Sequence, residues 1–301
     1  MSKIIGICVT LILLRFSTLG HVLAQKEPVA TLPKPPRCGM ALSDRLIGGP
    51  QTQIDEFPWT ALIQYRKSNG LTGFFCGGSL INSRYVLTAA HCIQTMPSGW
   101  KVIGVRLGEW DLTTEPDCVY ASEHCVDAPV DMGIEKIIVH EDYANNKSHY
   151  NDIALIRFNK SVDMSDSISP VCLPTEEPQR SQNKVGQTGY AAGWGKTENG
   201  TPSNVKLKVR LEVTDSESCA NIYGRLGVTI NDTQMCAKGL DSRDSCSSSS
   251  PGGSPFTKQE HVNNYLYGIS SMGPRSCGSK DMPEVYTNVA KYIDWIESQL
   301  E

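Results

Sequence analysis

The sequence contains no block of like charge, no C-x-x-C pair and no long apolar run beyond its first residues. Its 301 residues carry 28 Lys and Arg against 32 Asp and Glu, a formal net charge of −4. A chain without a basic stripe lacks the electrostatic footprint for nucleic acid or an acidic membrane, so we expect neither partner. The six histidines are scattered and no cysteines have zinc-site spacing, so we expect no metal and no cofactor.

The one strongly apolar run lies at the N-terminus. Met1–Lys3 is basic, Ile4–Leu14 is apolar, and Val22–Ala24 offers a small-residue cleavage site. This order predicts a secretory signal peptide over residues 1–24 and therefore a secreted, extracellular protein. A membrane anchor is the alternative, but the run is too short to span a bilayer and Arg15 interrupts it.

The cysteine count fits an oxidising compartment. Of eleven cysteines, Cys8 leaves with the signal peptide, and the remaining even number predicts a disulfide framework. Residues 25–45 follow the signal and are rich in proline. We expect them to form an extended linker that does not pack against a domain.

The remainder of the chain, 46–301, has the pattern of an all-β domain. Short alternating or β-branched stretches such as Lys136–His140 and Asp152–Arg157 are separated by Gly, Pro and Asn turns. Many short strands at this spacing favour Greek-key barrels. Apolar residues at helical spacing predict one closing helix; they are Val289, Tyr292, Ile293, Ile296 and Leu300.

Six short motifs occur in a fixed order along this domain. They are Phe57–Trp59, Cys76–Ile81, Thr88–Cys92, Ser169–Pro174, Ala192–Gly195 and Val285–Thr287. In combination they resemble the chymotrypsin-like, or trypsin-like (S1), serine proteases. Val105–Asp111, followed by Cys118 and Cys125, resembles in particular the catalytic domain of insect clip-type proteases. The resemblance implies two six-stranded β-barrels with a C-terminal helix. A clip module needs about six more cysteines upstream, where only Cys38 stands, so we expect none.

The resemblance assigns a catalytic triad in the order His, Asp, Ser. His91 matches the general base and Asp152 the residue that orients its imidazole. Ser250 is the ungapped match to the nucleophile, four residues after Cys246. A gapped alignment instead places Ser254 there, because the stretch from Cys246 to Pro255 is two residues longer than the family's.

The residues around Ser250 depart from the family's Gly-Asp-Ser-Gly-Gly motif. Ser249 replaces the aspartate that receives the new N-terminus, and a hydroxyl does not neutralise a buried ammonium. Ser248 replaces a glycine whose N–H donates to the oxyanion. Pro251 fixes its own φ and drives Ser250 towards an extended conformation. We therefore expect a chain that is catalytically impaired.

The resemblance also assigns a specificity pocket. Asp244 matches the carboxylate at the pocket floor that selects Arg or Lys. Ser271 and Gly273 match the strand that binds substrate backbone. Glu284 stands where the pocket wall usually has glycine, so we expect its side chain to intrude into the cavity. A calcium site near Glu109 is conceivable, but the altered loop gives no ligand set.

Processing sites follow from the same resemblance. Cleavage after Arg45 by a trypsin-like protease would free the amine of Leu46. The implied disulfides are Cys38–Cys172, Cys76–Cys92, Cys118–Cys125, Cys219–Cys236 and Cys246–Cys277. Four Asn-x-Ser/Thr sequons mark glycan candidates at Asn146, Asn159, Asn199 and Asn231.

The sequence thus predicts a secreted serine protease homologue that acts by binding. Its expected partners are other extracellular proteases or their protein substrates, in a cascade of the innate-immune or melanisation type. The alternative is an active trypsin-like endopeptidase that uses His91, Asp152 and Ser250. A third possibility is an error of the gene model across Asp244–Phe256, with an ordinary protease underneath.

Overall fold

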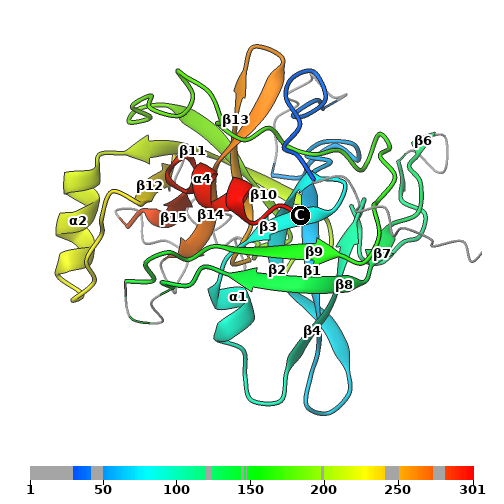
Figure 1. Ribbon diagram of the computed structural model, residues 1–301. Helices are drawn as coiled ribbons and strands as arrows, with labels where there is room; N and C mark the ends of the chain where they lie inside the picture. The colour runs from blue at the N-terminus through cyan, green and yellow to red at the C-terminus, as the bar shows by residue number, and fades with distance from the viewer. Residues whose placement is uncertain are drawn as a thin grey trace, which may run out of the picture.

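A computed structural model describes residues 30–41, 50–119, 124–143, 146, 148–197, 200–240, 251–273 and 282–301. Two antiparallel sheets dominate it (Figure 1). The first sheet has the strand order β7-β4-β1-β2-β3-β9-β8. Its strands are β1 (Thr60–Arg66), β2 (Thr72–Asn82), β3 (Tyr85–Thr88), β4 (Lys101–Leu107), β7 (Val130–Met132), β8 (Ile134–Val139) and β9 (Ala154–Phe158). A separate hairpin pairs β5 (Cys118–Val119) with β6 (His124–Cys125).

The second sheet is a closed six-stranded barrel in the order β10-β11-β12-β15-β14-β13. Its strands are β10 (Thr188–Gly193), β11 (Leu207–Thr214), β12 (Gln234–Gly239), β13 (Pro255–Glu260), β14 (Asn263–Met272) and β15 (Glu284–Asn288). The all-β, chymotrypsin-like fold class is confirmed. The first sheet has seven strands rather than six because Gly133 separates β7, which pairs with β4, from β8, which pairs with β9.

The two sheets share a packed interface. Leu266 and Ile269 of β14 belong to the same buried cluster as Leu87 of β3 and Leu155 of β9. Burial of apolar side chains from both sheets fixes the barrels against each other. Residues that lie far apart in the sequence are thereby held at one seam, and the candidate site lies there.

The predicted C-terminal helix is present as a 3-10 turn, η1 (Val289–Tyr292), that continues into α4 (Ile293–Ser298). Val289, Tyr292, Ile293 and Ile296 are all buried. The described residues also form the helices α1 (His91–Gln94) and α2 (Ser216–Gly224). No helix within the described residues is long and apolar enough to cross a bilayer.

Residues 30–41, the described part of the proline-rich segment, pack against the domain, which corrects the expectation of a free linker there. Ala30 and Leu32 contact the main buried cluster, and the Ala30 N–H donates to the Glu301 carbonyl at 3.1 Å. Farther along, the Asn263 side-chain amide donates to the Cys38 carbonyl at 2.7 Å. Prolines keep the backbone extended but leave its carbonyls free to accept hydrogen bonds, so an extended segment can lie along a surface.

Four disulfides join cysteines in the pairs that the resemblance implies. They are Cys38–Cys172, Cys76–Cys92, Cys118–Cys125 and Cys219–Cys236. Cys246 and Cys277 lie outside the described residues. Cys38–Cys172 ties the N-terminal segment to the domain.

Candidate active site

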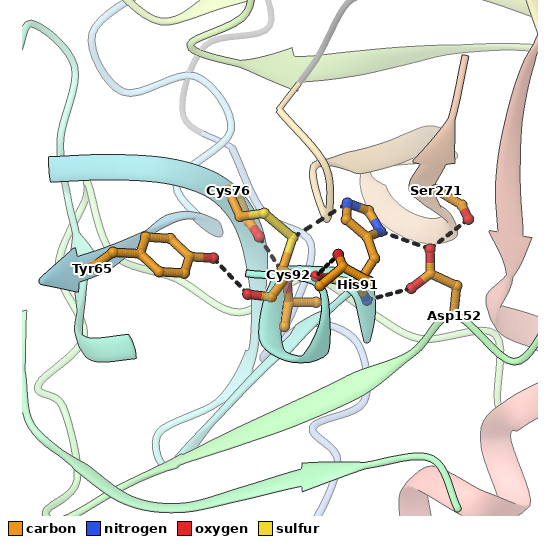
Figure 2. The surroundings of a disulfide bond; sticks show 9 residues. Tyr65, Cys76, His91, Cys92, Asp152 and Ser271 are labelled. Atoms are coloured by element: carbon orange, nitrogen blue, oxygen red, sulfur yellow. Dashed lines mark hydrogen bonds and ion pairs between the residues drawn. A yellow bond between two sulfur atoms is a disulfide. The ribbon is translucent and has the colours of Figure 1, made fainter. Parts of the chain in front are cut away.

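A histidine–aspartate pair lies at the seam between the barrels. The Nδ1 of His91 is 2.8 Å from Asp152 Oδ2, and the backbone N–H of His91 donates to Asp152 Oδ1 at 2.8 Å (Figure 2). The carboxylate of Asp152 therefore fixes both the ring and the backbone of His91. Asp152 is completely buried, whereas the side chain of His91 is 19% exposed. This geometry, in which a buried carboxylate orients the imidazole through Nδ1, suits a general base.

The second barrel positions Asp152. Ser271 at the end of β14 donates from Oγ to Asp152 Oδ2 at 2.5 Å, and Thr287 of β15 donates from Oγ1 to the Asp152 carbonyl at 2.8 Å. Figure 2 shows Ser271 on the side of Asp152 opposite to His91. A buried carboxylate needs such donors because desolvation otherwise disfavours its charge. The structure thus brings together three predicted site residues: His91, Asp152 and Ser271.

The disulfide beside His91 anchors its helix to β2. Cys92 follows His91 in α1 and bonds to Cys76, while Tyr65 of β1 donates to the Cys92 carbonyl at 3.0 Å. Burial raises the pKa of Tyr65, so its hydroxyl stays a donor. The start of α1 is therefore held from two strands.

The residue that faces Nε2 of His91, which also lies 3.6 Å from Cys92 Sγ, is a glycine. A methyl group built on Gly252 would lie 2.0 Å from His91 Nε2. The Gly252 carbonyl accepts from the Gly77 N–H at 2.9 Å, and the Gly253 N–H donates to the Ser270 carbonyl at 2.8 Å. These hydrogen bonds to β2 and β14 thus hold the loop against the imidazole of His91. A side chain at position 252 would overlap the ring.

Ser254 lies on the other side of that loop. It is 1% exposed, and its Oγ lies 2.6 Å from a methyl group built on Gly77 and 3.1 Å from one built on Gly193. Within the described residues it makes no hydrogen bond to His91. The other candidate, Ser250, lies outside the described residues, as do Ser248 and Ser249.

Glu284, the residue expected at the pocket wall, lies beside Gly273. It is 5% exposed, and its Cγ lies 3.0 Å from a methyl group built on Gly273. Tyr286 donates from Oη to Glu284 Oε2 at 2.5 Å. Burial raises the pKa of Tyr286 well above its ordinary value, which keeps that donor protonated. Asp244, the predicted pocket floor, lies outside the described residues.

His149 is a neighbour of His91 that the sequence did not single out. His91, His149 and Asp152 each have one potential metal-ligating atom within 4.8 Å of those of the other two. Burial lowers the pKa of His149, while the charge of Asp152 opposes that shift. Asp152 already accepts from His91 and Ser271, Gly252 lies against Nε2 of His91, and His149 Nδ1 lies 3.2 Å from Tyr143 Oη, so the atoms that would bind a metal already have other partners.

The carboxylates near Glu109 do not fit a calcium ion. Glu109 Oε2 accepts from Arg106 Nη1 at 3.2 Å, so a cation already occupies one face. Asp117 accepts from the Trp110 and Asp111 N–H groups at 2.8 and 3.1 Å. Calcium needs a shell of free oxygens, and these oxygens face donors. Burial raises the pKa of Glu109, with a further contribution from Asp117.

Comparison with known proteins decides the family. The family model described as Trypsin matches residues 46–296. The chain belongs to the trypsin family. It is 52% identical over 271 residues to CLIP domain-containing serine protease B4 of Anopheles gambiae, covering 90% of this chain and 74% of that protein. It is 44% identical over 277 residues to Melanization protease 1 of Drosophila melanogaster, covering 89% and 69%.

A solved structure shows the same fold for this trypsin-family chain. The Drosophila Grass clip serine protease of the Toll pathway matches with 34% identity and a TM-score of 0.74, covering 86% of this chain and 73% of that one. The resemblance to insect clip-type proteases is thus confirmed.

The processing sites are only partly described. Asn146, Asn159 and Asn231 are exposed, as a glycan requires. Asn199 and the cleavage site at Arg45 and Leu46 lie outside the described residues. Glycosylation and cleavage stay predictions.

Proposed function

We propose that this chain is a secreted, catalytically impaired member of the trypsin family that acts by binding, as a cofactor or regulator in an extracellular proteolytic cascade. The observation that carries the proposal is Gly252 against His91 Nε2, where a nucleophile would have to stand. Ser254 supports it, because its buried Oγ faces Gly77 and Gly193. The serine run over 247–250 supports it further, since it lacks the family's glycine and aspartate.

The type of cascade rests on relatives. One is named for melanisation and another for the Toll pathway, and both are clip-type or trypsin-like proteases. The partners of this chain are then other proteases of such a cascade or their protein substrates, and a trypsin-like protease cuts it after Arg45.

An active trypsin-like endopeptidase is the second candidate. The intact pair of His91 and Asp152 favours it, because this pair has the geometry of a working base. An active enzyme needs the serine-run loop to adopt an arrangement that places a hydroxyl within reach of Nε2.

Turnover separates the two candidates. Protein cut after Arg45 is assayed on Arg and Lys peptide esters beside its His91→Ala variant. Impairment predicts equal rates for the two proteins. An active trypsin assayed on the same esters serves as the positive control. Rates for the unmodified chain far above those of His91→Ala would establish the active enzyme.

A further inference from the structure

One stretch of the chain carries basic residues and no acidic ones. Between Glu56 and Glu109 the sequence has no Asp or Glu. Two arginines of this stretch, Arg84 and Arg106, pair with acids that lie outside it. The other Lys and Arg of the stretch are Arg66, Lys67 and Lys101.

Three of these cations gather at one edge of the first sheet. Arg66 ends β1 and Lys101 begins β4, and the two are direct cross-strand partners. Both are exposed, and Lys67 follows Arg66 in the β1–β2 turn. None of the three forms an ion pair with a residue that the structure describes. Like charges opposite each other destabilise a strand pair, so this edge favours an external anion.

Aromatic rings lie beside the three cations. Phe75 is 41% exposed and its ring centroid lies 4.6 Å from that of Trp100. The ammonium of Lys67 stands 4.8 Å from the centroid of Phe75 and 5.4 Å from that of Trp100. The two segments that carry these residues touch, because a methyl group built on Gly99 would lie 3.0 Å from Ser68 Cβ. They form the lower edge of Figure 1, below β4.

A mostly apolar cavity of about 330 Å³ adjoins Phe75. Phe75 lines it together with Leu62, Phe74 and Leu112, and it is also lined by Lys196 and by Pro251, which comes from the loop that faces His91. Aromatic residues and arginine are enriched in protein interfaces, and an apolar pocket beside them accepts an anchoring side chain.

We propose that the cationic aromatic edge, formed by Arg66, Lys67, Lys101, Phe75 and Trp100, binds an acidic segment of a protein partner that carries an aromatic side chain. Carboxylates of the segment pair with the three cations, and its aromatic side chain packs on Phe75 and enters the adjoining cavity. A sulfated polysaccharide would use the charges alone and leave the rings and the cavity unfilled. The proposal goes beyond the proposed function, since binding here needs neither His91 nor a nucleophile.

Fluorescence anisotropy on the intact chain tests the proposal with three probes. The first is a fluorescein-labelled peptide Glu-Glu-Phe-Glu-Glu-Glu, the second has Ser in place of Phe, and the third is a labelled heparin hexasaccharide. We expect the Phe peptide to bind tightest. Arg66→Glu with Lys101→Glu should weaken it by about tenfold or more at low salt, because two attractions become repulsions. Phe75→Ala should weaken the Phe peptide and leave the Ser peptide unchanged.

Matched controls keep the result specific. Arg210→Glu with Arg225→Glu makes the same change of net charge elsewhere on the surface and should alter binding less than twofold. Lys101→Glu alone places opposite charges across β1 and β4, so it should raise the melting temperature while it weakens the peptide. Equal weakening by the control pair, or heparin binding as tight as the Phe peptide and indifferent to Phe75→Ala, would overturn the proposal. The readout involves no catalysis, so a failure here is distinct from a failure of the proposed function.

Discussion

Lys206 is a buried cation whose removal should stabilise the protein. It is 3% exposed, and its ammonium lies 5.7 Å from the ring centroid of Trp194. Burial lowers the pKa of Lys206 to about 8, although the charges of Glu56 and Glu109 oppose the shift. The ammonium form is therefore disfavoured in the folded state relative to the unfolded chain.

The sign and size of the effect follow from linkage. Between pH 8 and the ordinary lysine value of 10.5, the unfolded chain binds more protons at Lys206 than the folded protein, so stability rises with pH across that window. Below pH 8 the full cost of burying the charge applies. A shift of this size corresponds to about 3 kcal/mol. Lys206→Met keeps the length of the side chain and removes the charge.

Denaturant unfolding with the disulfides intact measures the difference between Lys206→Met and the unmodified chain. We expect the variant to be more stable by up to about 3 kcal/mol at pH 7, with the gain shrinking as the pH approaches 10.5. Lys208→Met is the opposite control, because Lys208 pairs with buried Glu56 at 2.7 Å and its loss leaves that acid unpaired. A variant at Lys206 that is less stable at pH 7, or a difference independent of pH, would refute the reasoning.

Two further predictions concern the loop and the linker. Gly253→Ala should lower stability by about 2 kcal/mol or more, because Gly253 has φ +83° and a methyl group there would lie 2.3 Å from Thr88 Oγ1; thermal unfolding measures it. Gly186 has φ +77° and open space around it, so Gly186→Ala should lower stability only through backbone strain. Equal losses of stability at positions 186 and 253 would contradict the steric argument. Cleavage after Arg45 should leave the mass unchanged on a non-reducing gel, because Cys38–Cys172 holds the pieces; a released peptide without reductant would count against that disulfide in solution.

The sequence predicted the parts of the fold that local pattern controls. Strand alternation and turn residues predicted the barrels, and the apolar spacing from Val289 to Ile296 predicted the closing helix. Helix α2 was missed although a signal was present: Asp215 caps it by accepting from the Ser218 N–H at 2.8 Å. Only Cys219 and Tyr223 of α2 are buried, so the apolar periodicity of this segment is too weak to predict a helix.

Contacts between distant residues could not be predicted in the same way. The prolines of the N-terminal segment indicate an extended backbone but not the surface it lies on, and Ala30 meets Glu301 at the other end of the chain. His149 and His91 come from different segments of the chain, and their ring centroids lie 6.0 Å apart. Family motifs predicted Asp152, just before β9, and Ser271, near the end of β14.

The loop before β13 shows the limit of counting positions. The ungapped match from Cys246 leads to Ser250, and the gapped one leads to Ser254. The residue at the imidazole is Gly252, because the Gly77 N–H and the Ser270 carbonyl fix the register of the loop. These are tertiary hydrogen bonds, which carry no signature in a serine-rich stretch.

Covalent labelling of the nucleophile position tests catalytic impairment most directly. The protein is cut after Arg45, incubated with a serine-directed phosphonate beside an active trypsin, and digested for mass spectrometry across residues 244–256. We expect a stoichiometric adduct on trypsin and none on Ser250 or Ser254, because Gly252 faces His91 and Ser254 is buried with its Oγ against Gly77 and Gly193. Stoichiometric labelling of Ser250 or Ser254 would contradict the account and make this chain an active protease.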